Sequence, residues 1–251
     1  MLNPDEKIRY ERQLVIPEIG TIGQETLKSS KVLIVGAGGL GSPVAMYLAC
    51  AGVGTLGVVD EDIVSLSNLQ RQILHNTDRL EMKKVESAKL TLERLNPHVH
   101  IETYDTRLTE ERAMDIIAEY DLVVDAVDNL ATRYIVNDAC LKLEKPLVEA
   151  GVMRFDGMIL TILPGKGPCF RCIFPTPPPE GVGKTAAELG VFGATPGIIG
   201  CMQAMEAVKV LLGIGEPLVG RLLLFSGLDM TWNEAKVFKD PNCPACGGGA
   251  S

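Results

Sequence analysis

Apolar residues in the first 150 positions form short continuous runs separated by longer stretches of mixed polarity. Runs rich in Val, Leu and Ile are typical of parallel strands buried on both faces. Strands are predicted at 32–35, 56–59, around 100–104, 122–127 and 147–150. Helices are predicted between them at 43–51, 84–95, 109–119 and 130–143. This alternation predicts a Rossmann-like α/β fold with a doubly wound, mainly parallel sheet.

The pattern changes after residue 150. Hairpin-type strands are predicted at 157–163, 221–225 and 232–238, which would form an antiparallel C-terminal extension. The segment 175–193 is rich in proline and glycine and predicts a long surface loop, and 196–212 predicts a buried helix.

The same pattern predicts a single domain over 1–251. Its parts would be N-terminal helices (one or two) at 1–30, a nucleotide-binding half at 31–150, and a mixed sheet with zinc knuckles and a crossover loop at 151–251.

The composition, 46% hydrophobic and 22% charged over 251 residues, is ordinary for a globular protein. A formal net charge of −8 argues against a general nucleic-acid binder, which needs a basic surface. No apolar run is long enough to span a bilayer, and the N-terminus is polar and of mixed charge. We therefore expect no nucleic-acid or membrane partner and a cytoplasmic location.

A glycine-rich loop follows the first predicted strand and opens a helix. Its glycines, Gly36, Gly38 and Gly41, allow a tight turn in which the backbone can approach a phosphate. Asp60 ends the next strand, where a carboxylate can accept hydrogen bonds from ribose hydroxyls. These features indicate a nucleotide site, but they do not separate NAD, FAD and ATP.

A polar, basic segment, 65–72 (SLSNLQRQ), comes just after Asp60, and Lys84 follows at the start of a helix. Single surface cations are usually solvated, but Arg71 and Lys84 are predicted to lie beside the glycine loop. Two extra cations there favour a triphosphate over a dinucleotide.

Asp128 ends the predicted strand 122–127, where open α/β sheets bind ligands. A carboxylate near phosphates is a natural Mg²⁺ ligand, although Asp128 could instead cap the helix that follows. Asp125 lies within the apolar run and is expected to be a structural partner.

Two CxxC pairs, Cys169/Cys172 and Cys243/Cys246, have the spacing of zinc knuckles. Four thiolates make a closed tetrahedral site, so the metal is expected to be structural zinc that ties the C-terminal segment to the middle of the chain. Thiolates would also accept iron. The other cysteines, Cys50, Cys140 and Cys201, are expected to be buried small hydrophobes.

Taken together, these motifs resemble the MoeB/ThiF/HesA family of adenylating enzymes, bacterial relatives of the ubiquitin-activating E1 enzymes. The resemblance covers nearly the whole chain. The residues that carry it are Arg9-Tyr10-x-Arg12-Gln13, the loop 36–41, Asp60, 65–72, Lys84, Asp128-Asn129 and both CxxC pairs.

The resemblance implies an E1-like domain that uses ATP and Mg²⁺ to adenylate the C-terminal glycine of a small ubiquitin-fold sulfur carrier ending in Gly-Gly. Arg12 would enter the neighbouring site of a homodimer, and it would act in catalysis with Arg71, Lys84 and Asp128. The implied nucleotide site comprises Gly36, Gly38, Gly39, Gly41, Asp60, Ser67, Asn68, Leu69, Gln70, Arg71, Lys84, Asp128 and Asn129. Gly39, Asn68, Arg71 and Lys84 would contact the phosphates.

Some relatives carry a cysteine in the loop that corresponds to 175–193 and link it covalently to the carrier. This chain has none there, and Ala186 lies near the expected position. We therefore predict adenylation without a covalent adduct, with sulfur supplied by a separate sulfurtransferase or cysteine desulfurase. The pathway, of molybdopterin or thiamine type, stays open, with a lean toward the former.

Two other functions would explain part of the pattern. An NAD(P)-dependent oxidoreductase would explain the glycine loop and Asp60, but it leaves Arg12, Arg71, Lys84 and the knuckles without a role. It also lacks a proton donor, because His75, His98 and His100 are expected in loops or in solvent. A non-catalytic zinc-ribbon adaptor is disfavoured by the acidic balance.

Overall fold

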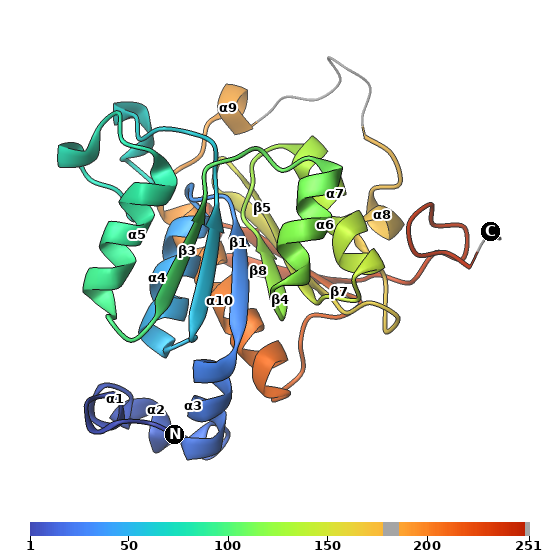
Figure 1. The fold of residues 1–251 in the computed structure, drawn as a ribbon. Coiled ribbons are helices and arrows are strands. Elements are labelled where there is room, and N and C mark those ends of the chain that lie inside the picture. Colours follow the sequence, from blue (N-terminus) through green and yellow to red (C-terminus); the bar gives the residue numbers. More distant parts are fainter. Residues whose placement is uncertain (178–185, 249–251) are drawn as a thin grey trace.

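The computed structural model describes residues 1–177 and 186–248 and contains one eight-stranded sheet in the order β3-β2-β1-β4-β5-β6-β7-β8 (Figure 1). The first five strands in that order are parallel, and β6 to β8 run antiparallel. The strands are β1 (Lys31–Val35), β2 (Thr55–Val59), β3 (His100–Tyr104), β4 (Leu122–Asp125), β5 (Leu147–Met153), β6 (Asp156–Ile162), β7 (Arg221–Ser226) and β8 (Thr231–Lys236). The predicted fold class is confirmed.

The α-helices of the described residues are α1 (Pro4–Arg9), α2 (Glu11–Leu14), α3 (Gly20–Ser29), α4 (Gly41–Ala51), α5 (Lys84–Leu95), α6 (Glu110–Ala118), α7 (Leu130–Lys142), α8 (Phe170–Ile173), α9 (Ala186–Leu189) and α10 (Ala194–Leu212). Short 3₁₀ turns lie at Leu66–Asn68 and Thr77–Arg79. The N-terminal segment forms three helices rather than one or two. Tyr10 separates α1 from α2, and Pro17 and a left-handed Gly20 (φ +55°) lie between α2 and the body of α3.

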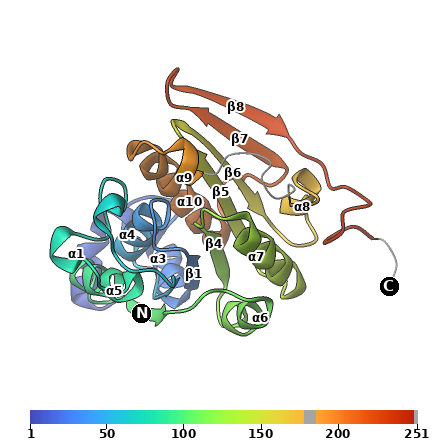
Figure 2. The same cartoon turned by 90° about the horizontal axis from the view of Figure 1, so that it is seen from above.

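Helices cover both faces of the sheet (Figure 2). Alternate residues of β1 point to opposite faces, so Val32 and Ile34 join a core with α4, α5 and α10. Leu33 and Val35 join a second core with α6 and α7. Burial on both faces explains why the parallel strands are continuous apolar runs.

Helix α10 crosses α4 at close range, because a Cβ on Gly200 would lie 2.5 Å from Cγ of Pro43. The crossing brings the start of α10 to the glycine loop, where Pro196 would lie 3.2 Å from a Cβ on Gly39. The predicted buried helix is therefore confirmed, and its first turn packs against the glycine loop.

Other local predictions also differ from the structure. Strand β4 ends at Asp125 instead of continuing to 127, because the Asp125 side chain accepts the N–H of Val127 and turns the chain. The loop 175–193 contains the short helix α9. Cys50 is exposed rather than buried, while Cys140 is buried as predicted and Cys201 is half-buried.

No helix in the described part of the chain is long and apolar enough to cross a membrane. The hairpin β7–β8 closes the far edge of the sheet, and every residue of β8 is exposed.

Candidate nucleotide site and four-cysteine cluster

The glycine loop lies at the switch point of the sheet, where the strand order reverses between β1 and β4. Open α/β sheets bind ligands at this point, beyond the carboxyl ends of the strands. Gly36 has φ +101°, and a Cβ there would lie 2.8 Å from the carbonyl oxygen of Ala126. Glycine is therefore required for the loop to turn against the end of β4.

The side chain of Asp60 holds the glycine loop by bonding to the backbone of the loop. Its Oδ2 accepts the N–H of Ala37 at 2.8 Å, and its Oδ1 accepts the N–H of Asp62 at 2.9 Å. Each carboxylate oxygen can accept a second hydrogen bond, so Asp60 keeps acceptor capacity for a ligand at the loop.

Arg71 is brought to the loop, as the sequence predicted for a phosphate-binding cation. Its Cγ would lie 3.4 Å from a Cβ on Gly39, and its Nη1 donates to the carbonyl oxygen of Ser67 at 3.2 Å. The 3₁₀ turn and the residues after it, including Asn68, Leu69 and Gln70, form the segment that carries Arg71.

Lys84 begins α5, and its side chain is only 6% exposed. Its Nζ donates to Oδ2 of Asp62 at 2.8 Å, whereas that carboxylate is largely exposed. An ammonium has three donors, so this pairing leaves donors for a phosphate.

Asp128 and Asn129 lie on the turn after β4, and both are exposed. Asn129 Oδ1 accepts the N–H of Thr132 at 2.9 Å, so Asn129 rather than Asp128 caps α7. Asn129 therefore takes the capping role that the sequence also allowed for Asp128, and the Asp128 carboxylate is exposed to solvent.

Arg12 does not reach the glycine loop of its own chain. Its neighbour Gln13 donates to the carbonyl oxygen of Ala51, at the end of α4 that lies away from the loop. The 11 residues of α4 span about 16 Å. Figure 1 likewise places α2 below the sheet, at the amino end of β1.

His75 is a site residue that the sequence argument missed. It is 6% exposed rather than solvated, and its Nε2 lies 2.9 Å from the carbonyl oxygen of Ala37. Its Nδ1 lies 2.9 Å from Oγ of Ser87 on α5. Burial lowers the pKa of His75, although the bond to Ala37 opposes this effect. A lone histidine in a polar segment gives no sequence signal of such contacts.

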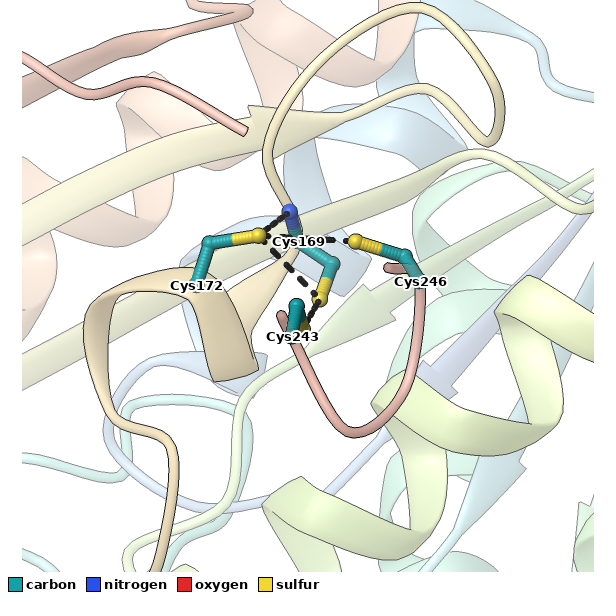
Figure 3. A group of neighbouring side chains, drawn as sticks. All are labelled: Cys169, Cys172, Cys243 and Cys246. Carbon is teal, nitrogen blue, oxygen red and sulfur yellow. Dashed lines mark hydrogen bonds between the residues drawn. The ribbon is translucent and has the colours of Figure 1, made fainter. Parts of the chain in front are cut away.

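The two CxxC pairs meet in space, as predicted (Figure 3). The Sγ atoms of Cys169, Cys172, Cys243 and Cys246 all lie within 4.8 Å of one another. Cys169 and Cys172 flank the start of α8, and the other pair lies on a C-terminal loop beside it.

The cluster fits a tetrahedral metal. Its Sγ–Sγ distances include 3.9 Å for Cys169–Cys172, 3.5 Å for Cys169–Cys243 and 3.4 Å for Cys172–Cys246. Four sulfurs at about 2.3 Å from zinc would lie about 3.8 Å apart. The cluster therefore suits zinc with little rearrangement.

Backbone groups support thiolates at this cluster. The N–H of Cys169 and the N–H of Asp240 both point at Sγ of Cys172, at 3.4 and 3.5 Å. Burial opposes ionisation of Cys243, but the backbone N–H groups of Cys246 and Ala245 lower its pKa to about 7. Burial raises the pKa of Cys169 and Cys246, so these two thiols need a bound metal to ionise at neutral pH.

The family model described as "ThiF family" matches residues 10–245. The chain belongs to the ThiF family. A ThiF-family relative from Thermus thermophilus, the sulfur carrier protein adenylyltransferase, is 49% identical over 97% of this chain and 92% of its own length. The adenylyltransferase and sulfurtransferase MOCS3 of Drosophila sechellia is 49% identical over 98% of this chain, which spans 54% of that protein.

Solved structures share the fold of this ThiF-family chain. E. coli MccB with ATP has a TM-score of 0.83 at 23% identity, covering 95% of this chain and 74% of that one. PaaA has a TM-score of 0.76 at 29% identity, covering 95% and 76%. At 23% identity the MccB likeness shows the fold alone.

Proposed function

We propose that this adenylyltransferase transfers AMP from ATP to the C-terminal glycine carboxylate of a small ubiquitin-fold sulfur carrier and releases pyrophosphate. The observation that carries the proposal is the packing of Arg71 against Gly39, at the switch point of the sheet. The Arg71 side chain packs against this loop through its Cγ, so its guanidinium is within reach of a triphosphate bound there and suits that charge.

The relatives support the choice of substrate. The Thermus thermophilus protein, which this chain matches over nearly its full length, is named for a sulfur carrier. The product would serve the biosynthesis of a sulfur-containing cofactor of molybdopterin or thiamine type.

The residues suit this chemistry because a carboxylate is already ionised at neutral pH and needs no general base. The protein must hold two anions together and stabilise the charge that develops on pyrophosphate. Arg71 and Lys84 each keep unused donors for that task. Asp60, next to the glycine loop, would receive the ribose hydroxyls.

Two metals fit the chain. Asp128 would hold Mg²⁺, and the bound ion would neutralise phosphate charge. The exposed Asp128 carboxylate suits this role because it lies on the turn after β4, which contacts Gly36 of the glycine loop. The four cysteines would hold zinc in a structural role, because all four positions of the tetrahedron are filled by sulfur.

We also propose a homodimer in which Arg12 completes the site of the partner subunit. Within one chain α2 contacts the end of α4 that lies away from the glycine loop. Large apolar side chains are exposed on the neighbouring helices, namely Ile22 of α3, Tyr47 of α4 and Met205 of α10. A second copy would cover such side chains.

Exchange of labelled pyrophosphate into ATP tests the proposal. Exchange should require Mg²⁺ and a Gly-Gly carrier, and the matched control is the same carrier without its last glycine. Mass spectrometry should show an AMP-capped carrier terminus. If no Gly-Gly carrier supports exchange and NAD(H), but not Mg-ATP, raises the melting temperature, the oxidoreductase reading replaces this one.

Sulfur transfer is proposed to occur on a separate sulfurtransferase or cysteine desulfurase. The relevant stretch 183–185 lies outside the described residues, and Ala186 begins α9. Non-reducing electrophoresis after turnover should show no reducible adduct between the chain and its carrier; a band that dithiothreitol removes would contradict the proposal.

A further inference from the structure

Three ionisable side chains are buried together behind the turn that carries Asp128. Asp125 and Glu149 are paired residues on the neighbouring strands β4 and β5, and neither is exposed to solvent. Arg133 of α7 is 6% exposed and forms an ion pair with Oε1 of Glu149 through its Nη1. Charges buried at this depth are costly, so an apolar set of similar volume would hold the layers together at least as well.

The cluster acts on one residue, Val127. Oδ1 of Asp125 accepts the N–H of Val127 at 3.0 Å. Nη2 of Arg133 donates to the carbonyl oxygen of Val127 at 2.9 Å. Both backbone polar groups of the residue before Asp128 are therefore fixed by buried side chains.

The turn is also fixed on its other sides. The N–H of Ala126 donates to the carbonyl oxygen of Val35 at 2.9 Å, and Gly36 lies against Ala126. Asn129, the residue after Asp128, is held by its cap on Thr132. Asp128 is thus an exposed carboxylate between two anchored neighbours.

The fork of Arg133 is what joins the two halves of this arrangement. One nitrogen, Nη1, bonds Glu149, and the other, Nη2, bonds Val127. Gln203 of α10 reaches the same place from the opposite face, because its Nε2 donates to the carbonyl oxygen of Asp125 at 2.7 Å. A lysine has a single ammonium and cannot reproduce the planar fork.

We propose that Arg133, anchored by Glu149, is a positioning residue that fixes the Val127 carbonyl and thereby aims the Asp128 carboxylate at the Mg²⁺ of the bound nucleotide. This inference rests on the proposed function for the role of Asp128. It predicts that substituting Arg133 impairs Mg²⁺-dependent activity more strongly than it lowers the stability of the fold.

The test compares Arg133→Lys with Arg171→Lys. Arg171 also contacts α7, through Asp138 at 2.7 Å, but lies on the side of α8 and away from the turn. Arg133→Lys should raise the Mg²⁺ concentration for half-maximal pyrophosphate exchange about tenfold or more. Arg171→Lys should lower the melting temperature and leave that midpoint within twofold of the wild type.

Hydrogen exchange of the free protein gives a readout that does not need activity. The peptide containing 126–129 should exchange faster in Arg133→Lys and unchanged in Arg171→Lys. If Arg133→Lys does not fold, Glu149→Gln replaces it, because it removes the charge that anchors Arg133 while keeping an acceptor for Nη1. This variant should shift the Mg²⁺ midpoint and the hydrogen exchange in the same direction.

An unshifted Mg²⁺ midpoint in an active Arg133→Lys enzyme would overturn the inference, whatever its stability. Unchanged exchange of the 126–129 peptide would do the same. If the wild-type protein shows no pyrophosphate exchange at all, the proposed function fails, and the hydrogen-exchange comparison alone decides whether Arg133 positions the turn.

Discussion

A hydrogen bond of 2.9 Å joins Nε2 of buried His75 to the carbonyl oxygen of Ala37 in the glycine loop. A carbonyl only accepts, so Nε2 carries the proton, and Nδ1 of the neutral ring accepts from Ser87 Oγ at 2.9 Å. The ring therefore ties the glycine loop to α5, the helix that begins with Lys84.

Replacing His75 should weaken ATP use according to which nitrogen is kept. The amide of Gln reaches the position of Nε2, whereas Asn reaches only that of Nδ1. We expect His75→Asn to raise the KM for ATP about 5- to 30-fold, because a buried carbonyl loses its donor at a cost of about 1–2 kcal/mol. His75→Gln is the control, and equal KM values for the two variants would contradict the assigned contact.

The same histidine should make stability depend on pH. Burial lowers its pKa in the folded state below the ordinary 6.5, and the nearby Lys84 and Arg79 act in the same direction. The unfolded chain therefore binds the proton first, and stability should fall as the pH drops below about 6.5 toward the folded-state pKa. The free energies of unfolding of the wild type and His75→Gln, measured in urea, should converge as the pH falls through this window. A parallel offset across it would argue against the histidine as the source.

Gly200 should not tolerate a methyl group. A Cβ there would lie 2.5 Å from Cγ of Pro43 and 2.6 Å from the carbonyl oxygen of Leu40. We expect Gly200→Ala to destabilise the fold by about 1–3 kcal/mol through overpacking. Gly197 lies in the same helix with no atom within 4 Å of its added Cβ, so Gly197→Ala should be neutral or stabilising by up to about 1 kcal/mol. Thermal unfolding of both variants checks the contrast.

Arg71 should matter for rate rather than for folding. Losing a cation that stabilises pyrophosphate should cost about 3 kcal/mol in the barrier, or about a hundredfold in rate. Arg71→Ala is compared with Arg94→Ala, whose side chain is exposed on α5. Exchange assays should show a loss only for the first variant. Melting temperatures of both variants should stay within about 2 °C of the wild type, because neither side chain is buried and such changes usually cost under about 0.5 kcal/mol.

Removing the metal should release the C-terminal segment. Cys246→Ser is expected to abolish binding of one zinc per chain and to lower stability by several kcal/mol, because metal binding is coupled to folding of the cluster. Cys50→Ser removes an exposed thiol outside the cluster and should change neither quantity. Elemental analysis with thermal unfolding provides the measurement, and full zinc content in Cys246→Ser would count against the four-sulfur site.

Much of the fold could be predicted because each parallel strand is buried on both faces. Runs such as 32–35 are apolar without alternation, and the glycine loop and Asn96-Pro97 mark where neighbouring helices begin or end. The CxxC spacing predicted the cysteine cluster, since two such pairs have the spacing of a shared tetrahedral metal site. The ends of strands were predicted less well. Strand β4 ends two residues early because the Asp125 side chain accepts the N–H of Val127 in the turn that follows.

The sequence by itself determined the order of strands and helices along the chain, the glycine loop and the members of the four-cysteine cluster, because those depend on local periodicity and spacing. Only the tertiary structure decided the contacts among residues distant in the chain. His75 meets Ala37, Arg133 joins Val127 to Glu149, and Arg12 lies far from the glycine loop of its own chain. Such contacts follow from how the layers pack, and a polar residue in a sequence does not reveal which backbone group it will face.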